Sequence, residues 1–140
     1  MKILIHTEVF DDVAICFKKK WYQSLGSEMP RVCRLLIQDG KLPGERPVHY
    51  LKLQSIQNKT IHAGINLPQE NVDKRRGARI IYVKENIGLL KVLYVGGHKD
   101  DRYDDSNRQT LMIESRYSTD RFIEYSDGLD FSNDPHKQAE

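Results

Sequence analysis

The chain of 140 residues lacks several features that identify common protein classes directly. It has only two cysteines, no Cys-x-x-Cys pair and no His-Glu-x-x-His run. A disulfide framework and a zinc site are therefore not expected, and we predict neither a metal nor a cofactor. Cys16 and Cys33 both fall in apolar helical patterns, which favours buried thiols in a reducing compartment.

The chain also lacks long apolar runs. None approaches the roughly 18 residues that a membrane-spanning helix requires, and the mean hydropathy is -0.63. The opening residues MKILIHTEVF contain no small-residue cleavage site and are interpreted as a first strand rather than a signal peptide. We therefore expect a cytoplasmic protein with no membrane partner.

The chain has little net charge, but its charges are unevenly distributed along the sequence. The formal net charge is only +2. Residues 1–99 hold 17 Lys and Arg against 9 Asp and Glu, whereas residues 100–140 hold 5 against 11. A basic body with an acidic end predicts a surface that binds a polyanion. The acidic end either shields that surface or only aids solubility.

The first third of the chain predicts a strand and two helices. The strand covers residues 2–6, and Thr7 is placed to cap the first helix. We expect Gly26 to end this helix, and its three- and four-residue spacing predicts one apolar stripe that includes Phe17. A second helix is expected from Ser27 to a stop at Gly40. The connection is short, so the two helices should form an antiparallel pair.

A β-hairpin is the most informative feature. Two apolar runs, Ala78–Val83 and Leu89–Val95, flank a polar turn at Lys84–Gly88. A hairpin brings its two outer ends together, so cations before the first strand should meet an imidazole and a phenol after the second. The side chains that would share this surface are Lys74, Arg75, Arg76, Arg79, His98, Lys99, Arg102 and Tyr103.

A third strand over residues 60–67 completes the order strand, two helices, three strands. This order predicts an α+β fold, in which an antiparallel sheet packs against an N-terminal helical hairpin. We place the main domain at residues 1–103. Residues 104–140 are expected to form an acidic C-terminal extension, partly helical and then frayed from Ser126.

Together these segments resemble the RelE-like branch of the RelE/ParE superfamily, bacterial toxins of type II toxin–antitoxin pairs. The likeness covers residues 1–103 and rests on GARIIYV followed by KVLYVGGHKDDRY. The positions that carry it are Gly77, Arg79, Ile80, Ile81, Tyr82, Gly96, Gly97, His98, Lys99 and Tyr103, with Leu42–Gly44 and Leu51–Leu53 between the helices and the sheet. Residues 104–140 extend beyond the family's usual short ending.

The resemblance implies a RelE-like microbial RNase-type fold and a toxin domain at residues 1–103. It implies an mRNA interferase, a ribosome-dependent endoribonuclease that inhibits translation and is silenced by a cognate antitoxin. One alternative is a non-enzymatic ParE-like toxin that binds gyrase. Another is an inactive regulatory relative, whose basic face is shielded by the acidic residues 104–140.

The candidate residues fit metal-free RNA cleavage, in which the ribose 2′-OH attacks the adjacent phosphate. Arg79 suits the phosphate, because its planar guanidinium matches phosphate oxygens. His98 could act as acid or base, and Tyr103 could donate a proton or stack on a base. These three are the predicted catalytic residues. The predicted RNA-binding residues are Lys74, Arg75, Arg76, Lys99 and Arg102.

Each of these residues also has a purely structural interpretation. Arg79 could cover a sheet edge, His98 could be a turn residue, and Tyr103 could pack on the sheet. We expect His62 to be structural. Lys18–Lys20 are expected to compensate the helix dipole and to stay solvated.

Overall fold

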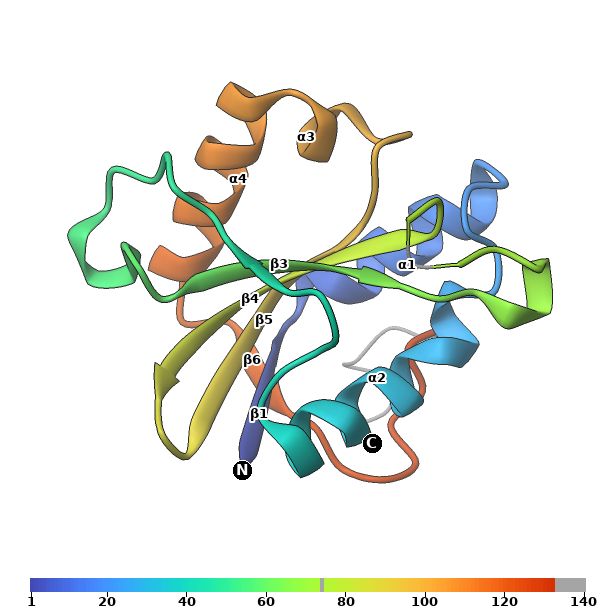
Figure 1. The fold of residues 1–140 in the computed structure, drawn as a ribbon, viewed down its shortest axis with the longest axis horizontal. Helices are drawn as coiled ribbons and strands as arrows, with labels where there is room; N and C mark the ends of the chain where they lie inside the picture. Colours follow the sequence, from blue (N-terminus) through green and yellow to red (C-terminus); the bar gives the residue numbers. More distant parts are fainter. Residues whose placement is uncertain (74, 133–140) are drawn as a thin grey trace.

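A six-stranded sheet organises the computed structural model, which describes residues 1–73 and 75–132 (Figure 1). The strand order is β2-β3-β4-β5-β1-β6. β1 is parallel to β5, and the other neighbours are antiparallel. The strands are β1 (Lys2–His6), β2 (Arg46–Pro47), β3 (Thr60–Ile65), β4 (Ala78–Asn86), β5 (Leu89–Gly96) and β6 (Phe122–Glu124). The predicted α+β class is confirmed.

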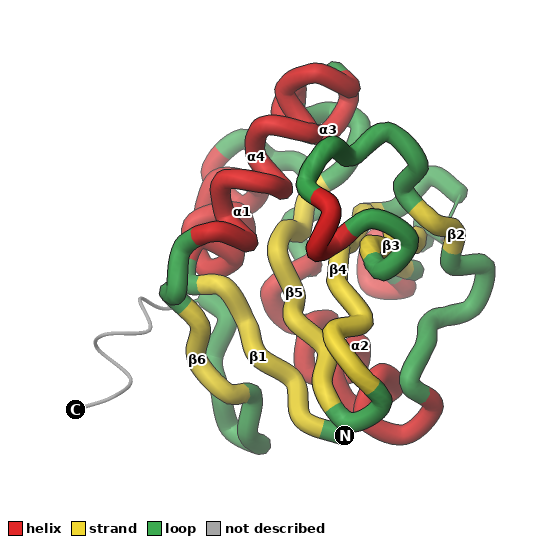
Figure 2. The backbone as a smooth tube through the Cα atoms, turned by 90° about the vertical axis from the view of Figure 1, so that its left-hand side faces the viewer, coloured by secondary structure: helices red, strands yellow, loops and turns green. Residues whose placement is uncertain are grey.

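Helices cover both faces of this sheet. α1 (Glu8–Lys18) and α2 (Leu25–Asp39) pack on one face, where alternate residues of the strands, such as Ile80 and Val92, form the main core. The short α3 (Asp101–Asp104) and α4 (Ser106–Ser118) lie on the opposite face with the chain between β2 and β3 (Figure 2). The hairpin is therefore buried on both sides, as its nearly continuous apolar runs predict.

The β4–β5 hairpin forms as expected, with two irregularities in its register. Arg79 lies across from Gly96, and Asn86 across from Leu89. The register shifts between Ile81 and Tyr82, which leaves Leu93 as an extra residue in β5. This bulge lets Leu93 and its neighbour Tyr94 both pack on the α4 side of the sheet.

The α1–α2 connection differs from the sequence prediction. α1 ends at Lys18, and Gly26 lies inside α2 rather than at the end of α1. A side chain at Gly26 would meet Val13 and Ser132, so the glycine allows close packing there. Phe17, expected in the core, is 65% exposed, because in the last turn of α1 the buried position is Cys16 rather than Phe17.

The chain after Tyr103 is part of the same folded body. Ile113 of α4 is buried against the sheet, and β6 pairs with β1. Fraying was expected from Ser126, but Phe131 is buried in the main core beside Phe10. The rest of the predicted frayed end, residues 133–140, lies outside the described residues. Because of these contacts, the described C-terminal residues contribute directly to the core.

A buried ion pair joins α4 to α1 where β1 and β5 separate. β1 pairs with β5 only as far as Val92, so the edge of β5 beyond that point needs other partners. The Asp12 carboxylate accepts from the Val95 amide, and the Arg116 guanidinium donates to the Leu93 carbonyl at 2.9 Å. Arg116 also donates twice to Asp12, at 2.6 and 2.9 Å.

Both cysteines are buried and unpaired, as predicted. Burial raises the pKa of each thiol to about 12, so neither is a reactive thiolate near neutral pH. Within the described ranges, no helix combines the length and the apolar character needed to cross a bilayer.

Candidate functional site

Two glycines at the end of β5 turn the chain toward α3. A side chain at Gly96 would lie 2.0 Å from the Tyr94 hydroxyl, and one at Gly97 would lie 2.7 Å from the Tyr22 hydroxyl. The same two hydroxyls accept hydrogen bonds from the Gly97 and Lys99 amides. Glycine is therefore required here by close approach, and the two phenols fix the loop that carries His98.

Tyr103 is carried by the single turn of α3. The Asp100 side chain caps this turn by accepting from the Arg102 amide at 3.0 Å. The Tyr103 ring stacks on Tyr94 with centroids 5.7 Å apart and is almost fully buried. Burial raises the pKa of Tyr103 to about 12, while the charge of Arg79 and a side-chain hydrogen bond from it act the other way. The phenol is therefore protonated near neutral pH.

Arg79 lies near the start of β4, and its guanidinium is held by backbone carbonyls of the residues just before it. It donates to the carbonyls of Gly77, Ala78 and Arg75 at 3.0–3.3 Å. Its cross-strand partner is Gly96, and Ile81, two residues later, pairs with Tyr94. Residues two apart on a strand share a face. Arg79 and the Tyr94–Tyr103 stack therefore lie on the same side of the sheet.

His62 on β3 is a site residue that we interpreted from the sequence as structural. It pairs with Ile81, one diagonal step from Arg79 on the same face. Its Nδ1 atom lies 3.3 Å from the Tyr103 hydroxyl. Burial lowers the pKa of His62, and the positive charges of Arg79 and Arg46 lower it further. In the neutral tautomer with its proton on Nδ1, His62 donates to the Tyr103 hydroxyl oxygen, as Arg79 does, which leaves the hydroxyl proton available to another acceptor.

His98 is the exposed member of this group. Its ring meets the Tyr103 ring edge-on at 5.0 Å. Its Nδ1 atom lies 2.9 Å from a carboxylate oxygen of Asp104, and both side chains are more than half exposed. If Nδ1–H donates to Asp104, the neutral ring presents the lone pair of Nε2 to solvent, where it can accept a proton.

The structure brings together the three predicted catalytic residues and adds His62. Tyr103 contacts His98 at its edge and His62 at its hydroxyl, and it interacts with Arg79. The set combines a fixed cation, a buried phenol, a buried neutral imidazole and an exposed imidazole. Such a group can bind a phosphate oxygen and move protons to and from the oxygens beside it.

The predicted RNA-binding residues have different environments. Arg75 and Arg76 are exposed in the turn before β4, and Lys99 is exposed with its ammonium 5.3 Å from the centre of the Tyr22 ring. Arg102 instead pairs with Asp100 and Asp12 inside the fold, at 2.8 and 3.1 Å. Its charge balances buried carboxylates rather than facing solvent alone. Lys74 lies outside the described residues.

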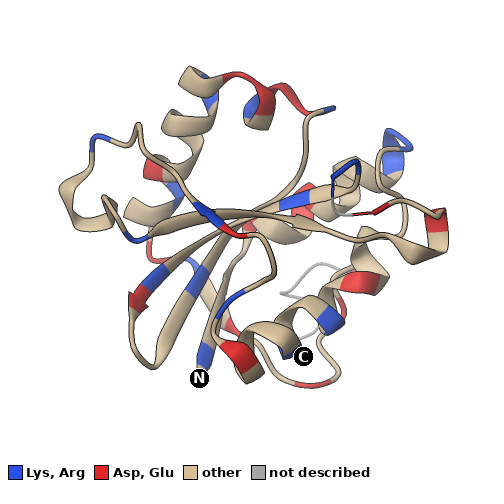
Figure 3. Ribbon diagram, in the orientation of Figure 1, with Lys and Arg blue, Asp and Glu red and all other residues tan. Residues whose placement is uncertain are grey.

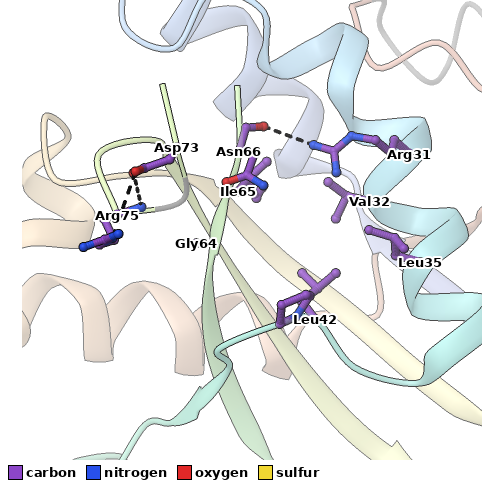
Figure 4. Close-up of a pocket in the computed structure, with 10 residues that line it drawn as sticks. Arg31, Val32, Leu35, Leu42, Gly64, Ile65, Asn66, Asp73 and Arg75 are labelled. Atoms are coloured by element: carbon purple, nitrogen blue, oxygen red, sulfur yellow. Dashed lines mark hydrogen bonds and ion pairs between the residues drawn. The ribbon is translucent and has the colours of Figure 1, made fainter. Parts of the chain in front are cut away.

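A separate cavity of about 290 Å³ lies on the α2 side of the sheet (Figure 4). Val32, Leu35 and Leu42 give it apolar walls, and the Arg31 guanidinium crosses it to the Asn66 carbonyl. No histidine or tyrosine is among its described lining residues. It therefore lacks the proton-transfer groups of the Arg79–Tyr103 cluster.

In the part of the chain that the structure describes, no group of three His, Cys, Asp or Glu side chains is arranged to hold a metal ion. Comparison with known proteins gave no match to any family model, curated protein or solved structure.

Proposed function

We propose that this chain is an endoribonuclease that cleaves RNA by attack of the ribose 2′-OH on the adjacent phosphate. The observation that carries the proposal is the convergence of Arg79, Tyr103, His62 and His98 on one side of the sheet. These residues come from β3, β4 and the segment after β5, and their shared location supplies the groups that the chemistry needs.

The reaction assigns a role to each group. A base, His98 Nε2, removes the proton from the 2′-OH, and the oxygen attacks phosphorus. Arg79 stabilises the added negative charge on the phosphate oxygens. The bond from phosphorus to the 5′-oxygen breaks, and that oxygen takes a proton from the Tyr103 hydroxyl, which His62 and Arg79 orient. The products are a 2′,3′-cyclic phosphate and a 5′-hydroxyl end.

The biological setting of the proposal comes from the resemblance to RelE-like toxins. We place the chain as the toxin of a type II toxin–antitoxin pair, which cuts mRNA on the ribosome in the cytoplasm until a cognate antitoxin binds it. The order of strands and helices and the closeness of Arg79 to Tyr103 support this setting.

Induced expression in bacteria tests the proposal. The wild-type chain should arrest growth and cut mRNA, and the new 5′ ends should require phosphorylation before they can be ligated. Arg79→Ala and His98→Ala should abolish the cuts, whereas Lys41→Ala, at an exposed lysine outside the cluster, should not. Arrest with DNA damage and intact mRNA would show a gyrase-binding toxin instead, and 5′-phosphate ends would contradict 2′-OH attack.

A further inference from the structure

The segment Phe17–Tyr22 ends beside the proposed catalytic cluster, where Tyr22 is buried, but its first four residues, Phe17–Lys20, are exposed. It reads Phe-Lys-Lys-Lys-Trp-Tyr and joins the last turn of α1 to the loop before α2. Phe17 is 65% exposed, and Lys18, Lys19 and Lys20 are all exposed. A single exposed apolar residue is common, but an exposed phenylalanine next to three exposed lysines combines the two kinds of group that bind single-stranded nucleic acid.

The backbone of this segment is held in place by specific contacts. Lys20 and Tyr22 adopt left-handed conformations, with φ of 60° and 46°, which are unfavourable for residues other than glycine. Such conformations persist only where surrounding contacts enforce them. Here the Trp21 amide bonds to the Cys16 carbonyl at 2.8 Å and the Tyr22 ring is buried.

Tyr22 connects this segment directly to the cluster. Its hydroxyl accepts from the Lys99 amide, and its ring lies under the Lys99 ammonium. Burial raises the pKa of Tyr22, and the charge of Arg79 acts against this increase. The Lys and Arg positions of the loop after α1 and of the turn before β4 lie at the same end of the molecule (Figure 3).

The three lysines are available for a partner of opposite charge. Among the described residues, none of them pairs with a carboxylate. Three unpaired ammonium groups match phosphates, and an exposed phenylalanine offers a face on which a base can stack. A double helix hides its base faces, whereas a single strand exposes them.

We infer that Phe17–Tyr22 is a binding arm for single-stranded RNA, with Phe17 stacking on a base and Lys18–Lys20 contacting phosphates next to the cleaved one. The inference builds on the proposed RNA cleavage and adds the strand state of the substrate and the surface that holds it. An acidic protein segment without apolar side chains would use the lysines but would gain little from the phenylalanine.

Binding of a labelled single-stranded 2′-O-methyl RNA of mixed sequence tests this arm, because blocked 2′-hydroxyls prevent cleavage. Phe17→Ala should weaken binding about 5- to 150-fold, the range expected for one stacked base. Ile87→Ala is the matched control, since Ile87 is 99% exposed at the far end of the β4–β5 hairpin and should leave binding unchanged.

The lysines are tested by the salt dependence of the same binding. Changing Lys18, Lys19 and Lys20 together to glutamine should reduce the slope of log affinity against log salt by roughly 2. The same change at the exposed Lys41, Lys52 and Lys59 is the control for net charge. Equal binding by each variant and its control would overturn the arm, as would no binding by the wild-type chain.

The two proposals fail in different ways. If mRNA is cut in cells but Phe17→Ala binds RNA normally, the arm is wrong and the nuclease stands. If Phe17→Ala and the lysine variant both weaken binding but no RNA is cut, the arm stands and the nuclease is wrong. If poly-glutamate displaces the RNA as well as unlabelled RNA does, and Phe17→Ala has no effect, the surface binds polyanions in general and the arm is overturned.

Discussion

Replacing Arg116 with alanine should severely destabilise the protein, because it leaves a carboxylate buried without its main partner. Asp12 is fully buried, and Arg116 supplies two of its hydrogen bonds, at 2.6 and 2.9 Å. The substitution also removes the donor to the Leu93 carbonyl at the bulge of β5. Arg102, 3.1 Å from Asp12, remains as a partial substitute.

The size of the effect follows from these contacts. Removing one partner of a buried ion pair costs about 3–5 kcal/mol, and the remaining Arg102 contact favours the lower part of that range. Domains of this size have total stabilities of roughly 5–15 kcal/mol, so the loss is a large fraction. We expect a lower urea midpoint with an unchanged slope, and a melting temperature reduced by roughly 10 °C.

Two further variants control this measurement. Arg108→Ala breaks an exposed pair with Asp101, 3.9 Å apart, and should change stability by less than about 0.5 kcal/mol. Asp12→Leu combined with Arg116→Met removes the unpaired buried charge and should recover only part of the loss, because the Val95 amide and the Leu93 carbonyl lose these partners. A cost below about 1 kcal/mol for Arg116→Ala would refute the view that this pair closes the gap between β1 and β5.

Three other predictions concern the C-terminal residues, acid stability and catalysis. A chain ending at Tyr103 should fail to fold rather than become more active, because it loses Arg116 from the buried pair. Circular dichroism and an RNA-cleavage assay test this. A folded fragment with higher activity would instead support shielding by the acidic end. His6 is fully buried, and burial lowers its pKa to about 4. Below about pH 6.5 the unfolded state therefore binds more protons than the folded state. The free energy of unfolding should fall by about 3 kcal/mol as the pH drops toward 4. Urea midpoints measured across this pH range should change less with pH in His6→Gln than in the wild type. An equal change in both proteins would contradict the role of His6 in acid unfolding. Tyr103→Phe keeps the stacked ring but removes the hydroxyl, and it should slow cleavage by about 10²–10⁴-fold with RNA affinity unchanged; a normal rate would exclude Tyr103 as the proton donor.

The residue pattern was sufficient to predict the first strand, the presence of two N-terminal helices and the central hairpin. Two apolar runs separated by a short polar turn pair with each other as a hairpin, so the ends that carry Arg79 and His98 approach. The strand and helix order limited the fold to an α+β arrangement. These features depend on neighbours a few residues apart, and the residue pattern records such neighbours directly.

Which distant side chains meet depends on how the whole chain packs. His62 entered the site because the register between β3 and β4, across a long loop, places it one step from Arg79. Phe17 is exposed because the packing of α1 buries Cys16 in its last turn instead. Asp12 contacts Arg116 because β1 leaves β5 after Val92. Register across long loops, helix ends and strand separation are set by packing of the whole chain, so no local pattern contains them.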